Sequence, residues 1–264
     1  MSRPGSPPNT ALHASVTPTQ DHGQWQHARQ HVRSGAAPQA DRVDQSSWSH
    51  IGPEVWSFEA RSTLATELRA TLQDGVHGLC FSPYLEGQQP GSQVSEAQIR
   101  ERLAILQPHA GWVRTFSCTD GHEQTPRVAH ELGLKTLVGA WLGTDAEINE
   151  REIASVIEVA RAGHADIVAV GNEVMLREDM SEDALLGFIQ RVKDALPGVA
   201  VGYVYAYFLF EKHPRITAAC DVVMTNCYPF WEGCPREQAL AYMQLMLACT
   251  RAAAPGPPHP ASVC

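Results

Sequence analysis

The sequence lacks the patterns that identify several common protein classes. It contains no CxxC pair among its seven cysteines, no basic stripe, and no stretch near the roughly 20 apolar residues of a membrane span. Its 29 acidic and 20 basic side chains give a formal net charge of -9. Nucleic acids and anionic membranes both attract clustered Lys and Arg, so neither is expected as a main partner.

Targeting and metal-binding patterns are also missing. The start, MSRPGSPPNTALHASV, has no apolar central run of a secretory signal, which predicts a cytoplasmic protein, or one of the cell envelope or periplasm if translation truly starts elsewhere. Cys220, Cys227 and Cys234 recur every seven residues, which is not zinc-site spacing, and we interpret them as buried thiols. No metal and no cofactor is expected, and the sequence does not define an oligomeric state.

The composition divides the chain of 264 residues into four segments. Residues 1–50 read as a disordered extension rich in Pro, His and Gln, and residues 51–75 as a linker with a short helix that stops at Gly75. Residues 76–254 hold the folded part. The last ten residues, PGPPHPASVC, form an aberrant Pro-rich tail.

The folded part alternates short apolar runs with amphipathic helices. The runs are continuous in apolar residues, which is typical of strands covered on both faces, and one β–α unit about every 30 residues predicts a parallel sheet. Six strands are expected at 77–82, 112–116, 134–142, 166–174, 199–205 and 221–227. The helices between them are expected at 95–107, 127–132, 145–162, 181–196, 210–219 and 235–253.

Two architectures fit this alternation: a doubly wound open sheet and a (β/α)8 barrel. The first strand is followed by Ser82, Pro83 and Tyr84 rather than by a Gly-rich phosphate loop, which disfavours a nucleotide-binding open sheet. We therefore expect a barrel of the (β/α)8 type that is incomplete, with about six β–α units.

Barrel enzymes carry their chemistry where the strands end. Glu173 ends the apolar run IVAVGNEV, where a charge is costly unless it has a role, although a single Glu at such a place more often caps a helix. The other strand ends carry aromatic and amide groups, which suit a neutral polyhydroxylated ligand. The candidate residues are Tyr84, Arg114, Trp141, Asn172, Glu173, Asn226, Tyr228 and Trp231.

Three of these strand ends carry a family resemblance. GNEV at 171–174, VRTFS at 113–117 and NCYPFWEG at 226–233 together resemble glycoside hydrolase family 17, the β-1,3-glucanase family, in its bacterial branch. The resemblance covers roughly residues 76–250. It implies a (β/α)8 barrel that cleaves or rearranges β-1,3-linked glucans with retention, so that the expected partner is a β-glucan oligosaccharide or polysaccharide.

The resemblance also implies roles for individual residues. Glu173 resembles the proton donor, Asn172 its sugar-binding neighbour, and Tyr228 the aromatic residue that lines the subsite of the cleaved sugar. Retaining hydrolysis needs a second carboxylate ~5–5.5 Å from the first. The family carries it after the seventh strand in a segment shaped like E-T-G-W-P, which this sequence lacks. Glu232 lies one strand away from that position, and we interpret it as a solvated loop charge.

A Pro-rich tail at the place of the seventh strand leads us to expect a frameshift or premature stop, with strands seven and eight missing. Three functions stay open. The first is a β-1,3-glucan hydrolase or glucanosyltransferase, inactive as this chain. The second is a non-catalytic carbohydrate-binding remnant. The third is another barrel enzyme, such as a sugar-phosphate lyase or isomerase, which would need a strand-end Lys or a phosphate-binding Gly motif that is not seen.

Overall fold

The computed structural model describes residues 58–254 and 262–263, all within one compact unit that spans Ser46–Cys264. The expected segment 1–50 and most of the tail 255–264 lie outside the described residues. Strands and helices alternate along the chain as the sequence predicts. The strands are β1 (Val76–Cys80), β2 (Ala110–Arg114), β3 (Lys135–Ala140), β4 (Ile167–Asn172), β5 (Ala200–Ala206), β6 (Val222–Asn226) and β7 (Ser262–Val263).

The helices are α2 (Phe58–Asp74), α3 (Glu96–Leu106), α4 (Thr125–Glu131), α5 (Ala146–Arg161), α6 (Glu182–Ala195), α7 (Pro214–Ala219) and α8 (Ala239–Ala253). Three helices, α3, α5 and α6, begin directly after a residue that caps them, whereas α7 and α8 each begin four residues later than the sequence predicts. Ser95, Asp145 and Ser181 each accept a backbone N–H bond from the first turn of the helix that follows, which satisfies donors that have no partner inside the helix.

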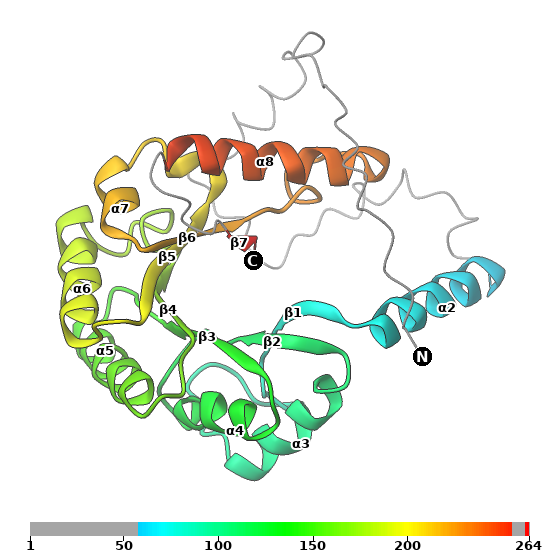
Figure 1. The fold of residues 1–264 in the computed structure, drawn as a ribbon, viewed down its shortest axis with the longest axis horizontal. Coiled ribbons are helices and arrows are strands. Elements are labelled where there is room, and N and C mark those ends of the chain that lie inside the picture. Colours follow the sequence, from blue (N-terminus) through cyan, green and yellow to red (C-terminus); the bar gives the residue numbers. More distant parts are fainter. Residues whose placement is uncertain (1–57, 255–261, 264) are drawn as a thin grey trace, which may run out of the picture. The chain divides into compact units, whose positions relative to one another are not determined.

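All seven strands pair in parallel and in sequence order, from β1 to β7. Figure 1 shows the strands as an inner arc with α3 to α8 on its outer side. Because every strand runs the same way, all the strand C-termini lie along one edge of the sheet. This edge collects residues that lie far apart in the sequence: Arg114 at the end of β2 and Asn226 at the end of β6 are 112 positions apart.

The seventh strand corrects an expectation. We expected strand seven to be missing, yet Ser262 and Val263 pair in parallel with Met224 and Thr225 of β6. Val263 and its partner Thr225 are both β-branched, which suits an extended pairing, and the prolines of the tail all precede the strand at positions 255–260. The edge of β6 is therefore partly covered, by two residues rather than by a full strand.

Both faces of the sheet are buried, which explains the continuous apolar runs. Successive strand residues point to opposite faces. Val168 and Val170 of β4 pack with side chains of α5 and α6, whereas Ala169 between them packs with Leu137 and Val204 on the other face. The sheet is thus enclosed between an outer helix layer and an inner layer of side chains, as in a barrel.

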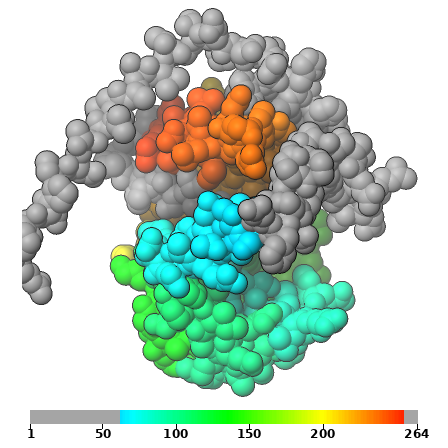
Figure 2. All heavy atoms as spheres, turned by 90° about the vertical axis from the view of Figure 1, so that its right-hand side faces the viewer, coloured from blue at the N-terminus to red at the C-terminus, as the bar shows by residue number. Residues whose placement is uncertain are grey.

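Apolar side chains remain exposed on the first and last helices of this unit. Figure 2 shows the face where α2 and α8 lie. Leu64 and Leu68 of α2, and Leu240 and Leu245 of α8, are all more than half exposed. None of the helices among residues 58–254 is both long and apolar enough to cross a membrane.

Gly202 and Gly187 differ in how closely other atoms approach them. A Cβ on Gly202 of β5 would lie 2.0 Å from the carbonyl oxygen of Val222, whereas a Cβ on Gly187 of α6 would meet nothing within 4 Å. We expect Gly202→Ala to lower the free energy of unfolding by about 1–3 kcal/mol through overpacking. Gly187→Ala should raise it by roughly 0.5–1 kcal/mol, because Ala favours the helix.

Urea denaturation of both variants measures the two effects. Gly187→Ala is the matched control, since it makes the same chemical change in an open place. Equal effects of the two substitutions would contradict the close approach of β5 and β6.

Candidate active site

Three alternate strands deliver the central polar group of the strand ends. Arg114, Asn172 and Asn226 are the last residues of β2, β4 and β6. Alternate strands of a barrel contribute side chains to the same layer, which explains why these three meet. The Arg114 guanidinium donates to Asn172 Oδ1 at 2.8 Å, and Asn226 Nδ2 lies 3.3 Å from the same oxygen.

Glu173 joins this group through a local distortion of β4. The pairing of β4 with β5 shifts between Ala169 and Asn172, so that three steps on β4 match two on β5. Gly171 in this bulge has φ +86°, and a Cβ there would lie 2.7 Å from the side chain of Val174. Glu173 itself has φ +53°. Asn226 Nδ2 donates to Glu173 Oε1 at 2.7 Å, so the bulge brings the carboxylate onto the layer formed by the three strands.

The group is mostly buried and two of its polar atoms have no protein partner. Asn226 is 2% exposed and Arg114 8% exposed, whereas Asn172 and Glu173 are half-buried. Within the described part of the chain, Arg114 Nε and Asn226 Oδ1 are buried without a hydrogen bond. A buried polar atom costs free energy unless it is paired, so both atoms are suited to bind hydroxyl groups of a ligand. Sequence reasoning assigned substrate binding to both residues, and this stays a prediction.

Tyr205 lies beside Glu173 and was not among the predicted site residues. It belongs to β5 and is 1% exposed. Burial, together with the nearby negative charge of Glu173, raises the pKa of its hydroxyl. Tyr205 therefore stays protonated and remains a hydrogen-bond donor. Its place at the end of an apolar strand was the one sequence feature that could have indicated a site residue, but a Tyr at a strand end is equally typical of core packing.

Trp141 is connected to the central group through Arg177, which sequence reasoning also missed. The Arg177 guanidinium carbon lies 4.9 Å from the centre of the Trp141 ring, a cation–π contact. The same guanidinium donates to the carbonyl oxygens of Leu142 and Asn172. Arg177 thus orients the 41% exposed indole of Trp141 relative to the end of β4.

Tyr84 takes part in a different contact. Its hydroxyl lies 3.0 Å from His122 Nε2, and the ring packs with the apolar cluster around Ile99 and Leu103. Burial lowers the pKa of His122, which favours the neutral imidazole. The structure therefore places Tyr84 with His122 rather than in the hydrogen-bonded group around Glu173.

Tyr228 and Trp231 lie in the loop that follows β6. They are 44% and 68% exposed, and Phe230 between them is 58% exposed. The loop therefore exposes three aromatic rings. Flat rings of this kind stack on the C–H faces of sugars.

A fully buried carboxylate orders two further strand ends. Glu152 of α5 is 1% exposed and accepts bonds from the backbone N–H of Cys118 at 2.8 Å and of Trp141 at 3.0 Å. The hydroxyls of Ser117 and Thr119 donate to its other oxygen. The loops after β2 and β3 are thereby joined to one helix. The sequence feature that could have indicated this role of Glu152 was its place on the apolar face of α5, beside Ile153.

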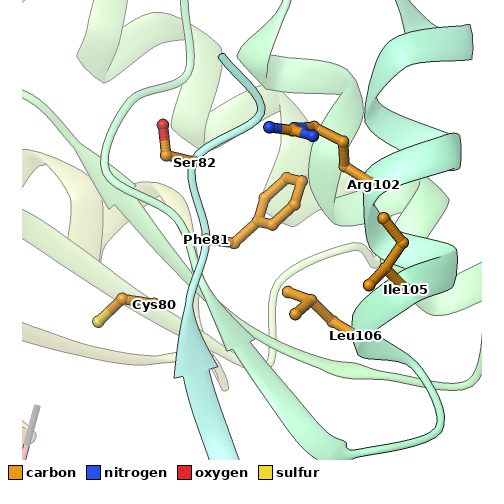
Figure 3. Close-up of a pocket in the computed structure, with 6 residues that line it drawn as sticks. All are labelled: Cys80, Phe81, Ser82, Arg102, Ile105 and Leu106. Atoms are coloured by element: carbon orange, nitrogen blue, oxygen red, sulfur yellow. The ribbon is translucent and has the colours of Figure 1, made fainter. Parts of the chain in front are cut away.

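One pocket lies apart from this group. It has a volume of about 260 Å³ and is lined by Cys80, Phe81, Ser82, Arg102, Ile105 and Leu106. Figure 3 shows Phe81 pointing from the end of β1 toward α3, while Cys80 points the other way. The described residues contain no cluster of three or more His, Cys, Asp or Glu side chains suited to a metal ion.

A comparison with known families agrees with this geometry. The family described as the BtgE/BtgC glycoside hydrolase domain matches residues 78–262, from β1 into β7. The chain belongs to this family. The matched range contains all the strand ends described above, and the predicted resemblance to glycoside hydrolase family 17 is confirmed.

Relatives of this glycoside hydrolase domain include fungal proteins. The glucan 1,3-beta-glucosidase of Schizosaccharomyces pombe is 23% identical over 189 residues, which cover 66% of this chain and 58% of the relative. The glucan 1,3-beta-glucosidase BGL2 of Candida albicans is 25% identical over 148 residues, 49% of this chain and 48% of the relative. The chain therefore spans about half the length of these curated relatives.

Solved structures share the architecture. The glycoside hydrolase family 17 beta-1,3-glucanosyltransferase from Rhizomucor miehei matches with a TM-score of 0.62 and 20% identity, covering 72% of this chain and 71% of that one. A beta-glucuronidase from Bacteroides uniformis matches with a TM-score of 0.51 and 13% identity over 66% of this chain and 23% of its own. At these identities the likeness concerns the fold, and it confirms the expected incomplete (β/α)8 barrel.

The buried carboxylate of this glycoside hydrolase domain yields a stability prediction. Glu152→Ala removes the acceptor for two backbone N–H groups, so we expect the free energy of unfolding to fall by about 3 kcal/mol. Glu150→Ala on the same helix is the control. Its ion pair with Arg191 is half exposed, and its loss should cost no more than about 1 kcal/mol. Chemical denaturation monitored by circular dichroism compares the two variants. An equal loss of free energy of unfolding would argue against a stabilising role of the buried Glu152 hydrogen bonds.

Proposed function

We propose that this domain carries the acid/base half of a retaining glycosidase site that acts on β-1,3-linked glucans. The observation that carries this proposal is the geometry of Glu173: a strand-end carboxylate, turned by a bulge onto the Arg114–Asn172–Asn226 group, with Asn226 Nδ2 2.7 Å from its Oε1. A glycosidase of this kind needs one carboxylic acid whose position relative to the sugar is held constant.

The hydrogen bond from Asn226 separates the roles of the two Glu173 oxygens. Oε1 accepts the amide N–H, which leaves Oε2 to carry the proton that is delivered to the glycosidic oxygen as the bond to the leaving sugar breaks. The protonated acid then becomes a carboxylate, and in the second half of a retaining reaction it takes a proton from water. Arg114 and Asn172 provide hydrogen-bonding groups beside this position for sugar hydroxyls.

The substrate class is supported by the lining and by the names of the relatives. Trp141, Tyr228 and Trp231 present exposed rings that suit the apolar faces of neutral sugar rings, and no basic cluster favours a phosphorylated or acidic ligand. Two relatives are named glucan 1,3-beta-glucosidases, and one neighbouring structure is a beta-1,3-glucanosyltransferase mutant in complex with laminaritriose. These names support a β-1,3-glucan as the ligand.

A retaining reaction also needs a second carboxylate, and the seventh strand of this chain does not supply one. The strand in that position contributes Ser262 and Val263, and the sequence has no Asp or Glu after Glu237. Without a nucleophile about 5–5.5 Å from the acid, a covalent glycosyl intermediate does not form. We therefore propose that this chain by itself binds glucan without turning it over. Hydrolysis and glucanosyl transfer both begin from that same intermediate, so either activity needs the missing group.

Titration with laminaritriose tests the ligand. We expect saturable binding to the 264-residue chain, weakened roughly tenfold by Trp231→Ala because a stacked ring is lost. Leu240→Ala, which removes an exposed apolar side chain from α8, is the matched control and should bind as the unaltered chain does. Calorimetry supplies the affinities. No binding by the unaltered chain would overturn the proposed ligand class.

Release of reducing sugar from laminarin tests the chemistry. We expect no turnover by the purified chain, with or without Glu173→Gln. Turnover by the unaltered chain that Glu173→Gln abolishes would confirm the acid but contradict the missing nucleophile, and a second carboxylate would then have to be sought elsewhere in the chain.

A further inference from the structure

The loop after β6 is a folded segment rather than an open excursion. We refer to residues 227–234 as the aromatic loop, because it carries Tyr228, Phe230 and Trp231. Within it, the N–H groups of Glu232, Gly233 and Cys234 donate to the carbonyl oxygens of Tyr228, Phe230 and Pro229 at 2.9–3.2 Å. Gly233 adopts φ +73°, which allows the tight return of the chain.

Glu232 ties this loop to the body of the domain. Its Oε2 accepts a bond from the Tyr242 hydroxyl of α8 at 2.6 Å, and the Tyr207 hydroxyl, just after β5, lies 3.3 Å away. The two hydroxyls lie 3.2 Å apart, and both tyrosines are less than a tenth exposed. Burial and the Glu232 bond raise the pKa of Tyr242, so its hydroxyl keeps the proton it donates. The interpretation of Glu232 as a solvated loop charge is therefore wrong.

The attachment of the aromatic loop through Glu232 matters because the rings of the loop are exposed. Phe230 and Trp231 lie edge to face, with ring centres 6.1 Å apart, and both are more than half exposed. Because both rings are more than half exposed, their orientation depends strongly on the conformation of the loop backbone that carries them. A ligand that stacks on them pays less conformational entropy when the loop is ordered beforehand. The carboxylate that orders the loop therefore contributes to affinity without touching the ligand.

We propose that Glu232 is a positioning residue: through Tyr207 and Tyr242 it holds the aromatic loop in the conformation that presents Tyr228 and Trp231 to a β-glucan. This inference rests on the proposed function for its ligand, but the ordering of the loop can be measured without any ligand. The competing role, that Glu232 supplies the second carboxylate of the reaction, uses the same side chain. Its Oε2 is already bonded to the Tyr242 hydroxyl, and that role becomes an outcome of the test.

Amide hydrogen exchange of residues 227–234 tests the attachment. For Glu232→Ala we expect exchange about tenfold faster, the change that corresponds to a loss of about 1.4 kcal/mol of local stability. Glu232→Gln keeps an oxygen that accepts the Tyr242 bond and should stay within about threefold of the unaltered chain. Tyr242→Phe removes the donor but keeps the ring, so it should resemble Glu232→Ala even if the latter folds poorly. Glu237→Ala, an exposed change just beyond the loop, is the control.

Laminaritriose titration and laminarin turnover of the same variants complete the test. We expect about fivefold weaker binding for Glu232→Ala and Tyr242→Phe, and nearly unchanged binding for Glu232→Gln and Glu237→Ala. Unchanged loop exchange in Glu232→Ala would overturn the proposal. The proposal would also be overturned if the unaltered chain turned laminarin over and Glu232→Gln and Glu232→Ala abolished this turnover equally. A nucleophile needs the negative charge of Glu232, whereas a residue that only holds the loop in place does not. If the unaltered chain binds no laminaritriose, the proposed function fails, and the exchange rates alone decide whether Glu232 orders the loop.

Discussion

The parallel pairing of neighbouring strands, from β1 through β6, is the constraint on which the candidate site depends. Parallel strands end on the same edge, so residues separated by more than fifty positions are brought within hydrogen-bond distance. The register then decides which side chains share a layer. Arg114, Asn172 and Asn226 meet because they end alternate strands, and their amide and guanidinium groups give Glu173 a defined neighbour for one of its two oxygens. A shift of one residue in any of these strands would turn the side chain to the opposite face.

Carboxylates of this domain act in two distinct ways. Glu173 is half-buried, with one oxygen bonded to Asn226. Glu152 and, in our proposal, Glu232 are instead occupied by donors from other elements and connect loops to helices. Catalytic loops need such support, since a binding surface on a loop is only as well ordered as the contacts beneath it. In this domain the support comes from carboxylates that accept hydrogen bonds from other elements.

Much of the architecture could be predicted from the order of residues. The strands followed from continuous apolar runs and the helices from the amphipathic segments between them, although α7 and α8 begin four residues after the predicted positions. The two-residue β7 could not be predicted, because Ser262 and Val263 have no periodic pattern and are extended only through pairing with β6. The role of Glu232 was misjudged for a related reason. Its hydroxyl partners lie 25 and 10 positions away on other elements, and no local pattern connects them.

The sequence by itself determined the alternation of strands and helices and the family resemblance, and it singled out Glu173 as the candidate acid, because apolar runs and short motifs act over a few residues. Only the tertiary structure decided which of the candidate residues meet. It brought Arg114, Asn172, Glu173 and Asn226 together, connected Trp141 to them through Arg177, and placed Tyr84 with His122 instead. The physical reason is that these contacts follow from strand register and from the bulge at Gly171, which depend on the pairing of whole strands rather than on the residues beside each position.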